Sequence, residues 1–234
     1  MGTIYTIAMH SESDSAEKVA LIQSEQSALL TALGVTISYN YNSGTPALEF
    51  TRTAEDNPFY LKNSNGNIYV YNAYEGYWIG GYTISGGMYI TVMCMDNSIM
   101  ISNNASSTGG DIIRAVYIIT KNSDGTVTLI GPMHHSSNPT SGNYMTIKET
   151  ALTSSNDPVA EFTGTLPTDD GFNQVALVNI PRMNVGKVCD NAFFTLCKPS
   201  EIYCGIVSVN GTEYAMARNK LTSSNILVYT LACR

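Results

Sequence analysis

Three pairs of short strand-like runs are joined by turns that few residue types can form, and these turns constrain the fold most. Each contains Asn-Gly or Asp-Gly, the dipeptides that supply the positive φ angles of tight hairpins. A tight turn joins antiparallel strands, whereas parallel strands need a long crossover. The chain is therefore predicted to be mainly β, with antiparallel strands arranged as a β-sandwich or barrel. The three turns are Asn65-Gly66, Asp124-Gly125 and Asn210-Gly211.

One amphipathic α-helix is predicted near the N-terminus, over about residues 14–33. Asp14 and Glu17 have the spacing of a capping box, and Gly34 stands where a left-handed cap ends many helices. Strand-like residues 3–10 and 35–42 flank the helix, whose apolar stripe is expected to pack on a sheet. The stripe consists of Val19, Ile22, Leu29, Leu30 and Leu33.

Two polar, turn-rich stretches indicate how the chain is divided. Residues 134–142 and 153–158 are rich in Ser, Asn and Pro and show no strand or helix period. Tyrosines are concentrated before them, and four of the five cysteines follow residue 138. We expect a β-rich lobe with the N-terminal helix at 1–138 and a β-sandwich-like C-terminal lobe at 139–234. A single domain is the alternative.

The chain carries unusually little charge for its length. Charged residues make up 13% of the 234, against roughly 25% in ordinary soluble domains. The net charge is −7 and the 12 basic residues are scattered, so binding to a nucleic-acid backbone is disfavoured. Interfaces are depleted in charge and enriched in Tyr, so the 15 tyrosines favour contacts with proteins, including other copies of the chain. A sandwich with amide-rich loops explains the same composition without a partner.

Neither a membrane segment nor a disulfide framework is expected. No window approaches the roughly 20 apolar residues that cross a bilayer, and the first ten residues do not resemble a secretory signal. The five cysteines include no C-x-x-C pair, which favours buried free thiols in a reducing compartment. A zinc site at Cys189, Cys197 and Cys204 would need a fourth ligand and tighter spacing, so no metal is predicted.

No motif for catalysis or for cofactor binding is present. The signatures of serine hydrolases, phosphate loops and dinucleotide-binding loops are all absent. His134 and His135 lie in loop-like sequence, and Asp169-Asp170 precedes a glycine as turn residues often do. We expect a non-enzymatic protein with no catalytic residue and no cofactor. The remaining alternatives are a metal held by the two histidines, or a reaction that depends on His134 or Asp170.

The best candidate for a binding surface is the aromatic run between Tyr69 and Tyr89. Tyr69 and Tyr71 should share one face of a strand, and Tyr74, Tyr77 and Trp78 follow around a turn. Aromatic residues dominate interface hot spots and stack on sugar rings, so Tyr74, Tyr77 and Trp78 are predicted as interface residues. Packing within the sheet is their alternative role.

The chain as a whole resembles bacteriophage virion structural proteins of tails, baseplates, necks or head decorations. The resemblance rests on the start, MGTIYTIAMHSESD, on the strands rich in Asn, Ser, Thr and Gly, and on the closing stretch CDNAFFTLCKPSEIYCGIVSVNGTEYAMA. The closing stretch is similar to carboxy-terminal β modules of small phage tail and structural proteins. The resemblance implies a homo-oligomer that contacts other virion proteins, is assembled in the host cytoplasm and resides in the virion. It implies no catalytic residues. The alternative is a carbohydrate-binding or host-adhesion module that uses the aromatics on a surface glycan.

Overall fold

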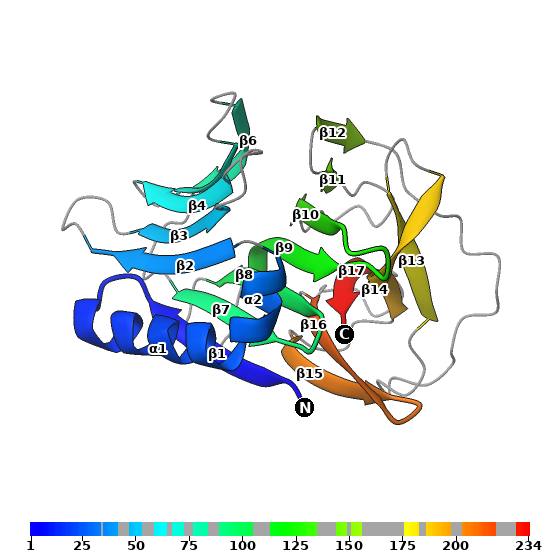
Figure 1. The fold of residues 1–234 in the computed structure, drawn as a ribbon, viewed down its shortest axis with the longest axis horizontal. Helices are drawn as coiled ribbons and strands as arrows, with labels where there is room; N and C mark the ends of the chain where they lie inside the picture. The colour runs from blue at the N-terminus through cyan, green and yellow to red at the C-terminus, as the bar shows by residue number, and fades with distance from the viewer. Residues whose placement is uncertain are drawn as a thin grey trace.

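The structure of the chain is a computed structural model, and its fold is mainly β, as predicted (Figure 1). All of the strand pairs in its described part are antiparallel. The residues described are 1–33, 35–41, 47–52, 59–64, 67–72, 77–83, 89–104, 113–134, 144–148, 151–155, 176–182, 186–197, 203–218 and 228–234.

Two large sheets and two smaller ones are formed by the described strands. The largest has the order β1 (Thr3–Ala8), β7 (Tyr89–Cys94), β8 (Ser98–Asn104), β9 (Ile113–Lys121), β10 (Val127–His134), β11 (Tyr144–Lys148) and β12 (Ala151–Ser155). The five-stranded sheet has the order β13 (Ala176–Arg182), β14 (Lys187–Cys197), β17 (Val228–Cys233), β16 (Thr212–Arg218) and β15 (Tyr203–Val209). The smaller sheets pair β2 (Val35–Asn40) with β3 (Ala47–Arg52), and β4 (Phe59–Ser64) with β5 (Asn67–Asn72) and β6 (Tyr77–Thr83).

The strands on either side of all three predicted turns form hairpins. Asn210 and Gly211, between β15 and β16, have φ angles of 50° and 79°, the two positive values that a type I′ turn requires. Gly125, between β9 and β10, also has a φ of 79°. Ser64 pairs with Asn67, so the third turn spans residues 65–66, which lie outside the described residues.

The predicted helix is present as two consecutive helices, α1 (Glu12–Glu25) and α2 (Ser27–Leu33). The prediction that Asp14 caps it is wrong, because the chain turns directly after β1 and the cap is Ser11, whose N–H donates to the Ala8 carbonyl. Asp14 lies inside the first turn and pairs with Lys18 at 2.9 Å. The helix is interrupted at the buried Gln26, so the two parts of the apolar stripe belong to two separate helices.

The core between the two large sheets combines large side chains with small ones. Met93, Met100, Ile118 and Ile130 of the larger sheet are fully buried in it. The five-stranded sheet contributes mostly small residues, so its backbone can approach the larger sheet closely. These small residues are Cys189, Ala192, Ala215, Ala217 and Cys233.

This core lies across the predicted boundary at residue 138. Ile130 and Ala215, from opposite sides of the boundary, belong to the same buried cluster. Within the larger sheet, β11 pairs with β10 across the same boundary. The proposed division into 1–138 and 139–234 stays a prediction, but any two such lobes share a sheet and a core.

The helices form a third layer on the other face of the larger sheet. Ile90, Val92 and Cys94 alternate along β7 with the core-facing Met93, and all are buried. Tyr5 is at the register position opposite Val92, and its hydroxyl donates to the carboxylate of Glu25 in α1. Figure 1 shows α1 lying along β1 and β2. The layers are therefore helix, sheet and sheet.

Candidate functional site

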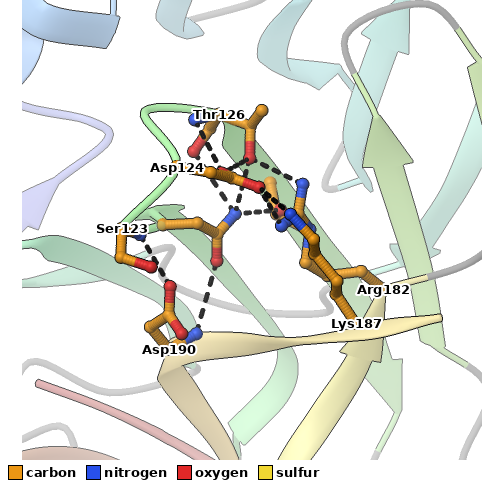
Figure 2. Close-up of polar contacts among 8 residues, drawn as sticks. Ser123, Asp124, Thr126, Arg182, Lys187 and Asp190 are labelled. Atoms are coloured by element: carbon orange, nitrogen blue, oxygen red, sulfur yellow. Dashed lines mark hydrogen bonds and ion pairs between the residues drawn. The ribbon is translucent and has the colours of Figure 1, made fainter. Parts of the chain in front are cut away.

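A polar cluster connects the two large sheets at the β9–β10 turn (Figure 2). Asp124, in this turn, accepts hydrogen bonds from Arg182 of β13 at 2.7 Å and from Lys187 of β14 at 3.2 Å. The second terminal nitrogen of Arg182 donates to the Thr126 hydroxyl at 2.7 Å. Arg182 is only 7% exposed, and its charge is compensated by Asp124. We call Asn122, Asp124, Thr126, Arg182, Lys187 and Asp190 the cross-sheet cluster.

Asn122 forms the second half of this cluster. Its side-chain amide is 2% exposed and donates to the Thr128 hydroxyl at 2.9 Å, while its oxygen accepts from the N–H of Asp190 at 3.3 Å. The Asp190 carboxylate accepts in turn from the N–H of Ser123 at 2.6 Å. Arg182 and Lys187 are thus paired with Asp124 across the sheets, and the Asp190 carboxylate is bound to a backbone N–H. This arrangement suits a structural connection between the sheets better than a role in proton transfer.

The charge of Asp124 gives a prediction about pH. The guanidinium of Arg182, then the hydroxyl and N–H of Thr126 and the ammonium of Lys187, hold the pKa of this carboxyl well below its usual range. Such a carboxyl stabilises the fold above its unfolded pKa of about 4, and the contribution is lost as pH falls below that value. We expect Asp124→Asn to lower the melting temperature at pH 7, and the difference from the unmodified protein to shrink towards pH 3. A difference that stays constant between pH 7 and pH 3 would contradict this role of Asp124.

At the opposite side of the sandwich, the outermost strands of the two large sheets lie side by side. β1 is at the end of the larger sheet and β15 at the end of the five-stranded sheet, and the two are in contact. The start of β1 lies close to β15: a Cβ added at Gly2, just before β1, would stand only 2.5 Å from Cδ1 of Ile206. Among the described residues, no further strand lies beside either of them in its sheet. We call these two strands the β1/β15 edge.

The β1/β15 edge lacks several of the features by which proteins prevent edge strands from pairing, although α1 packs against β1. Such features are charged residues, proline and bulges, and neither TIYTIA nor YCGIVSV contains a charge or a proline. The other end of the five-stranded sheet differs, since β13 carries Pro181, Arg182 and a register shift. Both strands of the β1/β15 edge are therefore suited to accept a further strand.

An apolar side chain is left exposed at this edge. Ile4 pairs in register with Met93, so it stands on the face of β1 that continues the sandwich core. Met93 is fully buried, whereas Ile4 is 44% exposed. The flank of the sandwich is open at this point, with apolar surface in contact with water.

A cleft of about 840 Å³ adjoins the start of β1. Asp96 and Asn97 of the β7–β8 turn line it, together with Thr212, Glu213 and Arg234. The Glu213 carboxylate accepts the N–H of Gly2 at 3.0 Å, and the Arg234 guanidinium donates to the Asp190 carbonyl at 3.2 Å. No histidine or cysteine is among the lining residues of the described chain, so this cleft offers neither a thiol nor an imidazole for catalysis.

The described thiols are buried, or half-buried in the case of Cys204, and none is activated. Burial raises the pKa of Cys94 and of Cys189 to about 12 and that of Cys204 to about 11, although hydroxyls of the facing sheet lower the last two slightly. Burial also raises the pKa of Cys233. Thiols with raised pKa values are poor nucleophiles and poor metal ligands. No group of three or more potential metal ligands occurs within the described ranges, and the side chain of Cys197 lies outside them.

The predicted interface residues are not on a single face. Tyr77 and Trp78 are neighbours on β6, where Tyr77 pairs with Asn72 and Trp78 with Tyr71, so they occupy opposite faces of the sheet. Tyr74 lies outside the described residues. Their role as interface residues stays a prediction.

The polar residues considered for catalysis are largely outside the described part of the chain. His134 ends β10, opposite Ala115, while His135, Asp169 and Asp170 are not described. Sequence reasoning missed both the cross-sheet cluster and the β1/β15 edge. The absence of charge from the β1 and β15 segments was the one available signal, and it became informative only once the strand order was known.

Comparisons with known proteins add no information on the family or function of the chain. Protein-family models, curated proteins and solved structures were all compared with the chain, and none matches it. Within the described residues, no helix combines the length and apolar character needed to span a membrane.

Proposed function

We propose that this chain is a non-enzymatic structural protein that assembles with copies of itself and with other proteins of a bacteriophage virion. One observation carries the proposal: the outermost strands of both large sheets are uncharged and lie side by side, with no further strand beside either among the described residues. The virion setting rests on the resemblance of the sequence to virion structural proteins. On this proposal the chain is made in the host cytoplasm and resides in the particle.

Pairing at the β1/β15 edge would extend both sheets into a neighbouring subunit. In strand addition, main-chain hydrogen bonds between the strands supply the affinity, and alternate side chains supply the specificity. Ile4 would then be buried instead of exposed to water. Such contacts need no cofactor.

A lysine at position 4 tests this proposal. Ile4→Lys places a charge at a partly exposed position of the edge strand, on its core-side face, and a charge on an edge strand is one of the devices that block edge pairing. We expect the unmodified protein to be multimeric and Ile4→Lys to be a monomer with the same melting temperature, as measured by light scattering and by thermal unfolding.

Val188→Lys is the matched control. Val188 is 46% exposed, close to the 44% of Ile4, but it lies on β14, inside the five-stranded sheet and away from the β1/β15 edge. This variant should keep the mass of the unmodified protein. Ile4→Lys that remains multimeric, or Val188→Lys that dissociates to the same extent, would refute pairing at the β1/β15 edge.

A further inference from the structure

The two strands of the β1/β15 edge run in opposite directions. Gly2, just before β1, lies beside Ile206 in the middle of β15. Further along β1, Thr6 pairs with Thr91, whose hydroxyl contacts the thiol of Cys204 near the start of β15. As β1 proceeds from residue 2 to residue 6, its neighbour on β15 therefore moves back from residue 206 to residue 204.

A second copy of the chain can meet this edge about either of two kinds of two-fold axis. An axis that points out of the edge, between the sheets, would put β1 beside β15 of the second copy, and the opposite directions of the two strands would make that pairing parallel. An axis perpendicular to the sheets puts each strand beside its own counterpart, and the rotation makes the pairing antiparallel. Antiparallel pairs are slightly more stable per residue. The perpendicular axis is therefore the favoured one.

We propose that the β1/β15 edge binds a second copy of the chain about a two-fold axis perpendicular to the sheets, so that β1 pairs with β1 and β15 with β15. This inference rests on the proposed function and names the partner of the edge. Self-pairing brings any charge on a strand close to a like charge on its copy, which is destabilising. Neither TIYTIA nor YCGIVSV carries a charge, so each strand is compatible with its own copy.

The faces of the strands determine where the axis passes. A perpendicular axis keeps each face of a sheet on its own side, and paired residues share a face, so the axis passes through a residue and not between two. The central residues of β1 are Tyr5 and Thr6. An axis through Thr6 passes β15 near Cys204, where only residues 203–205 can pair with their copies. An axis through Tyr5 passes near residue 205 and extends this pairing to residue 207, so we assign the axis to Tyr5.

This register makes a prediction about distances. Tyr5 lies opposite Tyr5 of the second copy, and residues directly opposite one another have Cβ atoms about 4.5–5.5 Å apart. That separation is close to the roughly 3.5–4.5 Å that a disulfide spans. Thr3 lies opposite Ile7 of the second copy, so the two Thr3 residues are about 14 Å apart along the strands. A cysteine at position 5 is therefore within reach of its counterpart, and one at position 3 is not.

Disulfide trapping tests this pairing. Tyr5→Cys and Thr3→Cys are each combined with Cys94→Ala, because Cys94 pairs with Thr3 and could capture a new thiol. We expect mild oxidation to convert most of the Tyr5→Cys protein to a dimer on a non-reducing denaturing gel, and about tenfold less of the Thr3→Cys protein. Thr3→Cys is the matched control, since both residues are half-buried and lie on the same face of β1.

The outcomes distinguish failure of this pairing from failure of the proposed function. If the unmodified protein is multimeric but Tyr5→Cys does not crosslink, or Thr3→Cys crosslinks equally, the two-fold pairing is overturned and assembly uses another contact. A monomeric unmodified protein overturns both. If Tyr5→Cys fails to fold, the double variant Ile4→Cys/Thr6→Cys decides, because Ile4 lies opposite Thr6 of the second copy. The double variant should crosslink and neither single variant should; any other result overturns the pairing.

Discussion

Replacement of Ile118 by alanine is expected to lower the free energy of unfolding by about 2–5 kcal/mol. Ile118 is fully buried at the centre of the inter-sheet core, between Met100 on β8 and Ile130 on β10. The sheet opposite contributes small residues such as Ala215 and Ala217, which cannot fill the resulting cavity. Urea unfolding followed by circular dichroism measures this loss. The loss is a large share of the free energy of unfolding of a typical domain, which is about 5–15 kcal/mol.

The exposed Val188 provides the comparison for Ile118. Val188→Ala should change the free energy of unfolding by no more than about 0.5 kcal/mol, since this side chain is 46% exposed. Similar losses for Ile118→Ala and Val188→Ala would mean that the two large sheets do not pack through the face that contains Ile118.

Replacement of Asn122 by alanine is expected to cost about 2–3 kcal/mol. The amide is buried and connects the sheets, because it donates to the Thr128 hydroxyl and accepts from the N–H of Asp190. Removing it leaves this N–H without its acceptor. Chemical denaturation at pH 7 measures the cost.

Ser123 is the matched control for Asn122. It is the next residue in the turn, it is exposed, and it contacts Asp190 through its backbone N–H, which alanine keeps. Ser123→Ala should therefore leave the stability nearly unchanged. Equal effects of Asn122→Ala and Ser123→Ala would show that the turn tolerates loss of the amide and that the cross-sheet cluster does not hold the sheets together.

The parts of the fold that could be predicted are those coded locally. Asn210-Gly211 and Asp124-Gly125 specify hairpins through the φ angles of a few residues, whatever the rest of the chain does. The apolar stripe of the helix could also be predicted from local sequence. The interruption of the helix at Gln26 could not, because that residue is buried by tertiary packing.

The parts that could not be predicted depend on which strands become neighbours. Asp124 and Arg182 are 58 residues apart, and no local pattern indicates their ion pair. β1 and β15 are adjacent only because of the strand order of both sheets. The aromatic run shows the same limit: the sequence indicated that Tyr69 and Tyr71 share a face of one strand, but only the register shows that Tyr71 is paired with Trp78.

The most direct test of the account is the molar mass of the unmodified chain as a function of concentration. Its central claim is that the uncharged outer strands of both sheets are covered by other subunits. Sedimentation equilibrium should give a molar mass above 25.3 kDa. This mass should either rise with protein concentration towards a multiple of 25.3 kDa or equal such a multiple at every concentration. A mass of 25.3 kDa at every concentration would contradict the claim.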